Sequence, residues 1–283
     1  MNFLQTFEPN RILFSFGILK IHWYGFFVLS GILAAIGISI FLARYYKNIH
    51  LNTEELLDIA FILIINGIIG ARVYEVFLEF AYYSKYPWDI FKIWQGGLAI
   101  HGTFIACALV LWYLYRYRKI NVLLLASIAA PGLALGQAIG RWGNYFNQEL
   151  FGCPTDLPWG IFISVANRPS EYLSATHFHP TFLYESLANL IIFLILIFLH
   201  YLIISKNFFR KYRKSKKFLE ILPLTLYLIF YSILRFSLEF IRIDKTLVIA
   251  NLRFPQIASL LTIFFVIVLM GVYLKKENKC DNN

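Results

Sequence analysis

Long apolar segments separated by short polar ones dominate the chain. Seven of them approach or exceed the roughly 20 residues with which a helix crosses a bilayer, at about 21–43, 56–78, 96–115, 121–141, 186–204, 221–241 and 255–274. This pattern predicts an all-α integral membrane protein with about seven transmembrane helices. We expect residues 1–283 to form a single polytopic membrane domain.

The longest connection between apolar segments covers residues 142–183. It is polar and broken by four prolines, so it is not expected to cross the bilayer and is predicted to form a small extracytoplasmic cap between the fourth and fifth spans. Residues 1–20 are mixed in character and are expected at the membrane interface. They lack the basic start, short apolar core and cleavage site of a secretory leader, so the first span is expected to be an uncleaved insertion signal.

Composition agrees with this pattern, since 59% of the 283 residues are hydrophobic and only 15% are charged. Soluble domains carry about 45–50% apolar and about 25% charged residues. The net charge of +10 comes from short basic clusters between the apolar segments, and one side of the predicted topology carries about twice as many Lys and Arg as the other. The positive-inside rule therefore predicts an outer N-terminus and a cytoplasmic C-terminus, with membrane lipids and not nucleic acid as partners.

Polar and ionisable side chains interrupt the predicted spans at one end. With the topology above, polar groups from seven segments collect in the outer leaflet or next to it: Tyr24, Arg72, Glu75, His101, Arg141, Asn144, Asn147, Glu149, His179, Tyr184, Glu185, Arg235, Glu239, Arg242 and Gln256. Such groups are costly in a membrane unless they are paired or solvated, so their convergence indicates a functional site. A site in the outer leaflet suits chemistry on a lipid head group, whereas a transporter would more often place its site near the midplane.

Several of these residues also have structural interpretations. Arg235 and Glu239 are four residues apart, and Arg72 and Glu75 are three apart, so each pair could neutralise itself on one helix face. His101 could be an interfacial histidine, and Tyr24 could belong to an aromatic belt. The glycines at 132, 136 and 140 indicate close helix packing. No metal site is expected at the pair of histidines at 177 and 179, and the three cysteines form no disulfide framework.

The segment Gly140–Gly152, GRWGNYFNQELFG, resembles the signature of the bacterial prolipoprotein diacylglyceryl transferases. Further marks of that family occur in order, namely Trp23–Gly25, Gly70–Arg72, the Gln95–Gly97 and His101–Gly102 segments, His179–Glu185 and Arg235–Arg242. Two positions depart from its pattern: Thr103 stands where a second glycine is usual, and the segment after Gln256 lacks a proline–methionine pair.

The resemblance implies that a diacylglyceryl group moves from phosphatidylglycerol to the lipobox cysteine thiol of a prolipoprotein signal peptide, giving a thioether and glycerol phosphate in the bacterial cytoplasmic (inner) membrane. His101 is then the candidate base, because an imidazole can accept a thiol proton at neutral pH, with Tyr24 as positioner or relay. Arg141 and Arg235 are candidates for binding the phosphate. The remaining candidates for binding substrate are Asn144, Asn147, Glu149, Glu239, Arg242 and Arg72. No cofactor and no metal are expected.

Two other functions are compatible with an apolar chain that carries outer-leaflet charges. A transporter or flippase for a lipid or small anion would need a water-accessible path through both leaflets. A structural membrane scaffold would tolerate substitution of every candidate residue. The ordered motifs favour the transferase over both.

Overall fold

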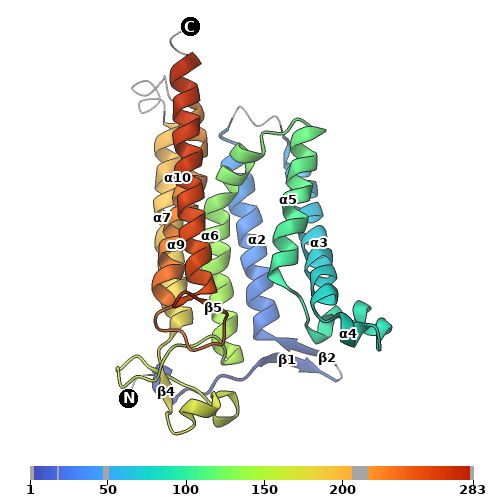
Figure 1. Cartoon of the computed structure of the whole chain (residues 1–283), viewed down its shortest axis with the longest axis vertical. Coiled ribbons are helices and arrows are strands. Elements are labelled where there is room, and N and C mark those ends of the chain that lie inside the picture. The colour runs from blue at the N-terminus through green and yellow to red at the C-terminus, as the bar shows by residue number, and fades with distance from the viewer. Residues whose placement is uncertain (1–2, 18, 47–50, 206–215, 281–283) are drawn as a thin grey trace. The chain divides into compact units, whose positions relative to one another are not determined.

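The computed structural model describes residues 3–17, 19–46, 51–205 and 216–280, and helices dominate it (Figure 1). Six helices are long and apolar enough to cross a membrane: α2 (Trp23–Ala43), α3 (Thr53–Leu78), α6 (Val122–Asn147), α7 (Thr181–Ile204), α9 (Lys216–Leu238) and α10 (Phe254–Cys280). A seventh apolar helix, α5 (Ile100–Arg116), has 17 residues and a length of about 26 Å, slightly less than the ~30 Å hydrocarbon core. The chain is thus a multi-pass helical membrane protein, and its seventh span stays a prediction.

Short elements connect these helices. They are α1 (Phe3–Thr6), α4 (Phe80–Tyr83) and the 3-10 turns η1 (Pro87–Phe91), η2 (Ile93–Gln95), η3 (Val165–Asn167) and η4 (Ser170–Tyr172). Three antiparallel hairpins, which the hydropathy pattern did not predict, pair β1 (Ile12–Phe16) with β2 (Leu19–His22), β3 (Ile161–Phe162) with β4 (His177–Phe178) and β5 (Val248–Ile249) with β6 (Leu252–Arg253). They are short and lie in connections, where alternation over two to five residues is too brief to detect.

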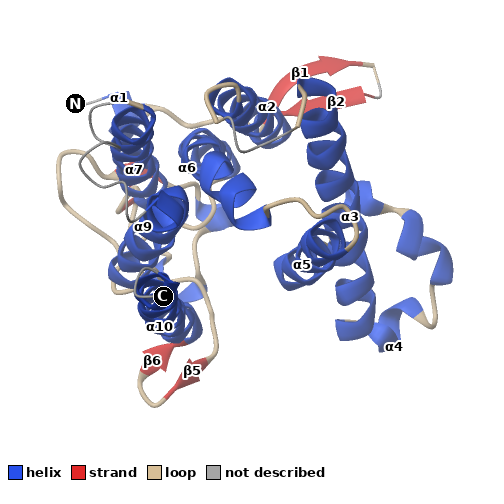
Figure 2. Cartoon of the chain, turned by 90° about the horizontal axis from the view of Figure 1, so that it is seen from above, coloured by secondary structure: helices blue, strands red, loops and turns tan. Residues whose placement is uncertain are grey.

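The described chain divides into two compact units, one comprising residues 1–45 and 126–283 and the other residues 46–125. In the first unit, α6 lies between α2 and the group formed by α7, α9 and α10 (Figure 2). Half of the most apolar stretch of α6 is buried, against 17% in both α2 and α10. Helix α6 is therefore the central helix of this unit.

Glycines bring α2 and α6 into backbone contact. A Cβ atom at Gly132 would lie 2.5 Å from the Ala35 carbonyl oxygen, and one at Gly31 would lie 2.7 Å from that of Gly136. Only glycine permits such an approach. Gly140, the third member of the predicted packing series, has open space where its Cβ would be, so the packing interpretation was wrong for that residue.

Helix α6 continues beyond the predicted end of its span at 141 and runs to Asn147. The extra turns are held by aromatic packing: the Tyr145 ring stacks on Phe182 at 4.7 Å, and the Phe146 ring stacks on Trp23 at 4.6 Å. The first six residues of the predicted cap are thus helical, which places two candidate asparagines on a helix and not in a loop.

The remainder of the 142–183 segment packs around a core that it shares with the end of α6 and the start of α7. Its buried members are Tyr145, Phe151, Ile161, Ile163, Phe178 and Phe182. The Cys153 amide donates to the Ile241 carbonyl at 2.8 Å, which joins this segment to the loop after α9. Within the first unit, the segment and the three hairpins gather at one end of the helices (Figure 1).

In the second unit, α3 packs against α5. Helix α3 begins with a capping box in which Asn52 and Glu55 bond each other's backbone amides. The Thr103 hydroxyl donates to the Gly67 carbonyl at 3.1 Å, so the residue that departs from the family pattern links the two helices.

Candidate functional site

The centre of the candidate site is an ion pair between two helices of the first unit. Arg141, near the end of α6, places Nη2 2.6 Å from Oε1 of Glu185 in the first turns of α7. Glu185 is almost fully buried, whereas the Arg141 side chain keeps about a quarter of its surface exposed. Arg141 also donates to the Tyr231 hydroxyl on α9. The guanidinium is thus fixed from two neighbouring helices while one face stays open.

A chain of hydrogen bonds leads from Arg141 to the end of α6. Arg141 Nη1 donates to Asn144 Oδ1 at 3.3 Å, and Asn144 Nδ2 donates to Glu149 Oε1 at 2.8 Å. Asn147 Nδ2 reaches the same carboxylate oxygen at 3.2 Å. Four polar residues of the Gly140–Gly152 motif therefore form one connected chain of hydrogen bonds.

The turn after α6 aims Glu149 back toward the helix end. Its two neighbours, Gln148 and Leu150, adopt left-handed backbone with φ of 51° and 56°, which is uncommon for residues other than glycine. Hydrogen bonds from the cap offset the cost of this backbone conformation. Gln148 Oε1 accepts from the Ser164 amide at 2.9 Å and from Asn167 Nδ2 at 2.8 Å. Gln148 is itself buried, so the cap sets the position of the carboxylate.

A second set of ion pairs surrounds Glu239 at the end of α9. Arg235 Nη2 and Arg253 Nε each lie 3.0 Å from an oxygen of this buried carboxylate. The pairing of Arg235 with Glu239 that the four-residue spacing suggested is present. Arg235 also has a buried Nη1 without a hydrogen-bond partner among the described residues.

Arg242 connects the two sets. Its Nη1 lies 3.9 Å from Glu185 Oε2, and its Nε donates to Asp244 Oδ1 at 2.7 Å. Asp244 in turn lies 3.7 Å from Arg253 Nη2. Four arginines and three carboxylates are thereby linked without a break, and Arg242 is buried in the middle.

Tyr24 adjoins this network from α2. It lies in the first turn of that helix, and a Cβ atom at Gly143 would lie 3.0 Å from its Cδ2 atom. The ring therefore packs against α6 between Arg141 and Asn144, and it keeps 41% of its surface exposed. A tyrosine so placed can present its hydroxyl to a molecule bound at the network.

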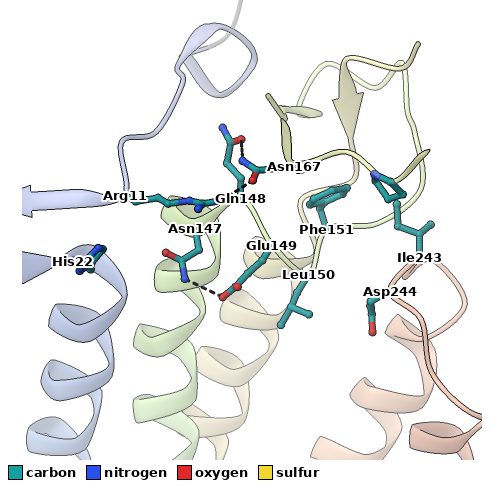
Figure 3. Close-up of a pocket in the computed structure, with 11 residues that line it drawn as sticks. Arg11, His22, Asn147, Gln148, Glu149, Leu150, Phe151, Asn167, Ile243 and Asp244 are labelled. Carbon is teal, nitrogen blue, oxygen red and sulfur yellow. Dashed lines mark hydrogen bonds between the residues drawn. The ribbon is translucent and has the colours of Figure 1, made fainter. Parts of the chain in front are cut away.

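A polar pocket of about 550 Å³ continues the network outward (Figure 3). We call it the cap pocket, and its lining consists of Arg11, His22, Asn147, Gln148, Glu149, Leu150, Phe151, Asn167, Pro169, Ile243 and Asp244. Asn147 and Glu149 belong both to this lining and to the hydrogen-bond chain from Arg141. The arrangement therefore offers fixed guanidinium groups at the helix ends and an adjoining hollow outside them.

Two predicted site residues, Arg72 and His101, lie in the second unit. Buried Arg72 donates to the carbonyls of Ile90, Gly96 and Gly97, each at 2.8 Å, and to that of Asp89. Among the ion pairs of the described residues, none joins Arg72 to Glu75, so the suggested neutral pair is replaced by carbonyl binding. The ring of His101, in the first turn of α5, lies 5.9 Å from that of Tyr74 on α3.

Comparison with known proteins decides the family. The model of the prolipoprotein diacylglyceryl transferase family matches residues 11–272. The chain belongs to that family. It is 40% identical to the phosphatidylglycerol–prolipoprotein diacylglyceryl transferase of Synechococcus elongatus over 98% of this chain and 92% of the relative. The proteins of the same name from Acaryochloris marina and Synechocystis sp. are 39% and 37% identical, over 97% and 99% of this chain and 94% and 95% of their own lengths.

Sequence reasoning missed several members of this network. Glu185 was placed among the converging polar groups and in a family motif but received no role, and Tyr231, Asp244 and Arg253 carried no signal in their local spacing. Arg253 counted only as a loop cation, although it donates to the carbonyls of Glu239, Arg242 and Asp244. Pairing across α6, α7 and α9 depends on tertiary packing, so local spacing did not reveal it.

Proposed function

We infer that this protein transfers the diacylglyceryl group of phosphatidylglycerol to the lipobox cysteine thiol of prolipoproteins, as the names of its relatives state for them. The observation that carries this is the open face of Arg141, which Glu185, Tyr231 and Asn144 hold at the end of the central helix. A phosphodiester is the anion that such a group recognises through two parallel hydrogen bonds.

The reaction replaces a carbon–oxygen bond by a carbon–sulfur bond. The cysteine sulfur attacks the carbon of the diacylglyceryl group that is bonded to a phosphate oxygen. The bonding electrons leave with that oxygen, and the phosphate departs with the second glycerol as glycerol phosphate. The thiol loses its proton to a base. Negative charge therefore grows on the phosphate as the bond breaks, and groups already oriented toward that position stabilise it without further reorganisation.

In this proposal Arg141 and Arg235 bind the phosphate and stabilise its departing charge. The buried carboxylates Glu185 and Glu239 orient them, because each carboxylate already contacts two arginines. The networks let a phosphate oxygen approach the exposed guanidinium faces while Arg141 stays paired with Glu185 and Arg235 with Glu239. Asn144 and Asn147 can donate hydrogen bonds to glycerol and phosphate oxygens, Glu149 can accept from glycerol hydroxyl groups, and Arg242 holds Glu185 and Asp244 in place.

His101 is proposed to accept the thiol proton, with Tyr24 as positioner or relay. Support for His101 comes from its imidazole chemistry and from its match to the family motif. We further propose that the protein resides in the bacterial cytoplasmic membrane with its cap and its site on the outer side. The excess of basic residues in the opposite connections supports this orientation.

Thioether formation on a lipobox peptide with phosphatidylglycerol tests the function. We expect transfer by the wild type, and a loss of at least about 100-fold in Arg141→Ala, the size expected when an electrostatic stabiliser of the transition state is removed. His101→Asn should lose most of its rate while it still binds lipid. A wild type without transfer would refute the function, and an unchanged His101→Asn rate would remove His101 from the role of base.

A further inference from the structure

The cap pocket lies outside the helices that carry the arginine network. Its lining comes from the turn that follows α6, the loop that follows α9, and the first hairpin that leads into α2. Figure 3 shows Arg11 and His22 on one side, Ile243 and Asp244 on the other, and Asn147 and Glu149 between them. A molecule in this pocket would thus lie beyond the helix ends and touch the same carboxylate that is connected to Arg141.

The cap pocket continues into a second hollow. The second hollow, of about 420 Å³, shares Arg11, His22, Gln148 and Asn167 with the cap pocket and continues toward Glu8, Lys20 and Ser164. The shared wall is rigid, because Asn167 Oδ1 accepts from Arg11 Nη2 at 2.6 Å while its Nδ2 group donates to buried Gln148. Two adjoining hollows along one fixed wall suit an extended chain better than a compact head group.

The chemistry of the lining also favours a polypeptide. A peptide backbone offers both N–H donors and C=O acceptors, and the pocket offers guanidinium donors at Arg11 opposite carboxylate acceptors at Glu149 and Asp244. Those two carboxylates repel a free phosphate, and the many polar groups disfavour an acyl chain. Leu150, Phe151 and Ile243 supply an apolar wall for a small side chain.

We propose that the cap pocket binds the residues of the prolipoprotein that follow the lipobox cysteine. This inference rests on the proposed function: if the thiol reacts beside Arg141, the apolar part of the signal peptide lies along the membrane helices, and the chain after the cysteine must leave through the extramembrane segments. The cap pocket is the polar hollow that adjoins the network there. Arg11 and Asn167 then determine affinity for the acceptor peptide and not for phosphatidylglycerol.

Two lipobox peptides test this proposal with the full-length enzyme in phosphatidylglycerol vesicles. Both carry the same apolar segment and cysteine, but the short one ends one residue after the cysteine and the long one continues for five more polar residues. With the wild type, we expect the long peptide to have a KM about tenfold lower, the effect of one or two hydrogen bonds to a charged group. Arg11→Ala and Asn167→Ala should reduce this ratio to nearly one.

Matched variants separate the pocket from general effects. Glu171→Ala changes an exposed cap residue outside both hollows and should keep the tenfold ratio. Because Arg11 is exposed, Arg11→Glu should fold. Between long peptides that carry Glu or Lys at the third position after the cysteine, the wild type should have the lower KM for the Glu peptide and Arg11→Glu the lower KM for the Lys peptide.

Three results would overturn the proposal: equal KM values for the two peptides with the wild type, a ratio that persists in both variants, or variants that change the KM for phosphatidylglycerol alone. The last result would mean that the pocket takes the head group. Transfer to neither peptide by the wild type would refute the proposed function itself.

Discussion

Arg72 and Arg141 both lie in long apolar helices, one in each unit, yet their partners differ in kind. Arg72 is buried and donates to four backbone carbonyls of the segment between α4 and α5. Arg141 keeps an open face and pairs with Glu185 and Asn144. Four backbone carbonyls accept from the buried guanidinium of Arg72. Arg141 instead keeps an exposed face within a network of four arginines and three carboxylates, which has one positive charge in excess. The same residue type therefore holds a loop in one unit and is the centre of the candidate site in the other.

The largest effect is expected from Glu185→Ala, which removes the carboxylate shared by Arg141 and Arg242. Arg141 would then lose its carboxylate partner and Arg242 would keep only Asp244. Breaking a buried ion pair in this way typically costs about 3–5 kcal/mol. Thermal unfolding in detergent should show a clearly lower Tm than for Glu171→Ala in the exposed part of the cap. Equal Tm values for the two variants would mean that the network contributes nothing to stability.

Arg141→Lys should reduce kcat/KM by about 100-fold while the protein stays folded. Lysine keeps the charge but presents a point charge where the site has a planar fork, so the bidentate contact with phosphate is lost. Initial rates of thioether formation measure this effect, with circular dichroism as the control for folding. A lysine variant with the wild-type rate would show that charge alone suffices, which would weaken the contrast with Arg72.

Arg72→Ala is expected to act on its loop more than on catalysis. It leaves four carbonyls to find other partners, at a cost of about 1–3 kcal/mol for each that stays unsatisfied. The two glycines it binds adopt positive φ, and a Cβ atom at Gly97 would lie 2.6 Å from Arg72 Nη1, so the loop is shaped around this side chain. Hydrogen exchange should rise in residues 84–99 and not in the cap. A rise in both regions would indicate global unfolding.

The smallest effect concerns Asp89, which lies in the same loop. A hydrogen bond from Lys92 lowers the pKa of this carboxyl most, and a second one from Tyr82 lowers it further below its usual value. Because the pKa is lower in the folded state, the carboxylate stabilises the loop above the unfolded pKa of about 4, and this contribution is lost as the pH falls through the folded value. Loop hydrogen exchange at pH 7 and pH 3, corrected for intrinsic rates, should differ less in Asp89→Asn than in the wild type.

The sequence predicted much of this fold because membrane spans are encoded locally. Six predicted spans correspond to helices that can cross a bilayer, and the 140–152 motif proved to be one hydrogen-bonded network. The three hairpins, the extension of α6 to Asn147 and the carbonyl ligands of Arg72 were not predicted. Each of these depends on contacts between distant segments, such as Tyr145 with Phe182, which hydropathy and spacing do not report.

The close approach of α2 and α6 restricts how a two-tailed lipid can reach the site. At Gly132 and Gly136 the backbones of these helices touch, with no side chain between them that could move aside. An acyl chain therefore cannot pass between α2 and α6 at this contact. Larger residues at these two glycines would force α2 and α6 apart and remove this barrier.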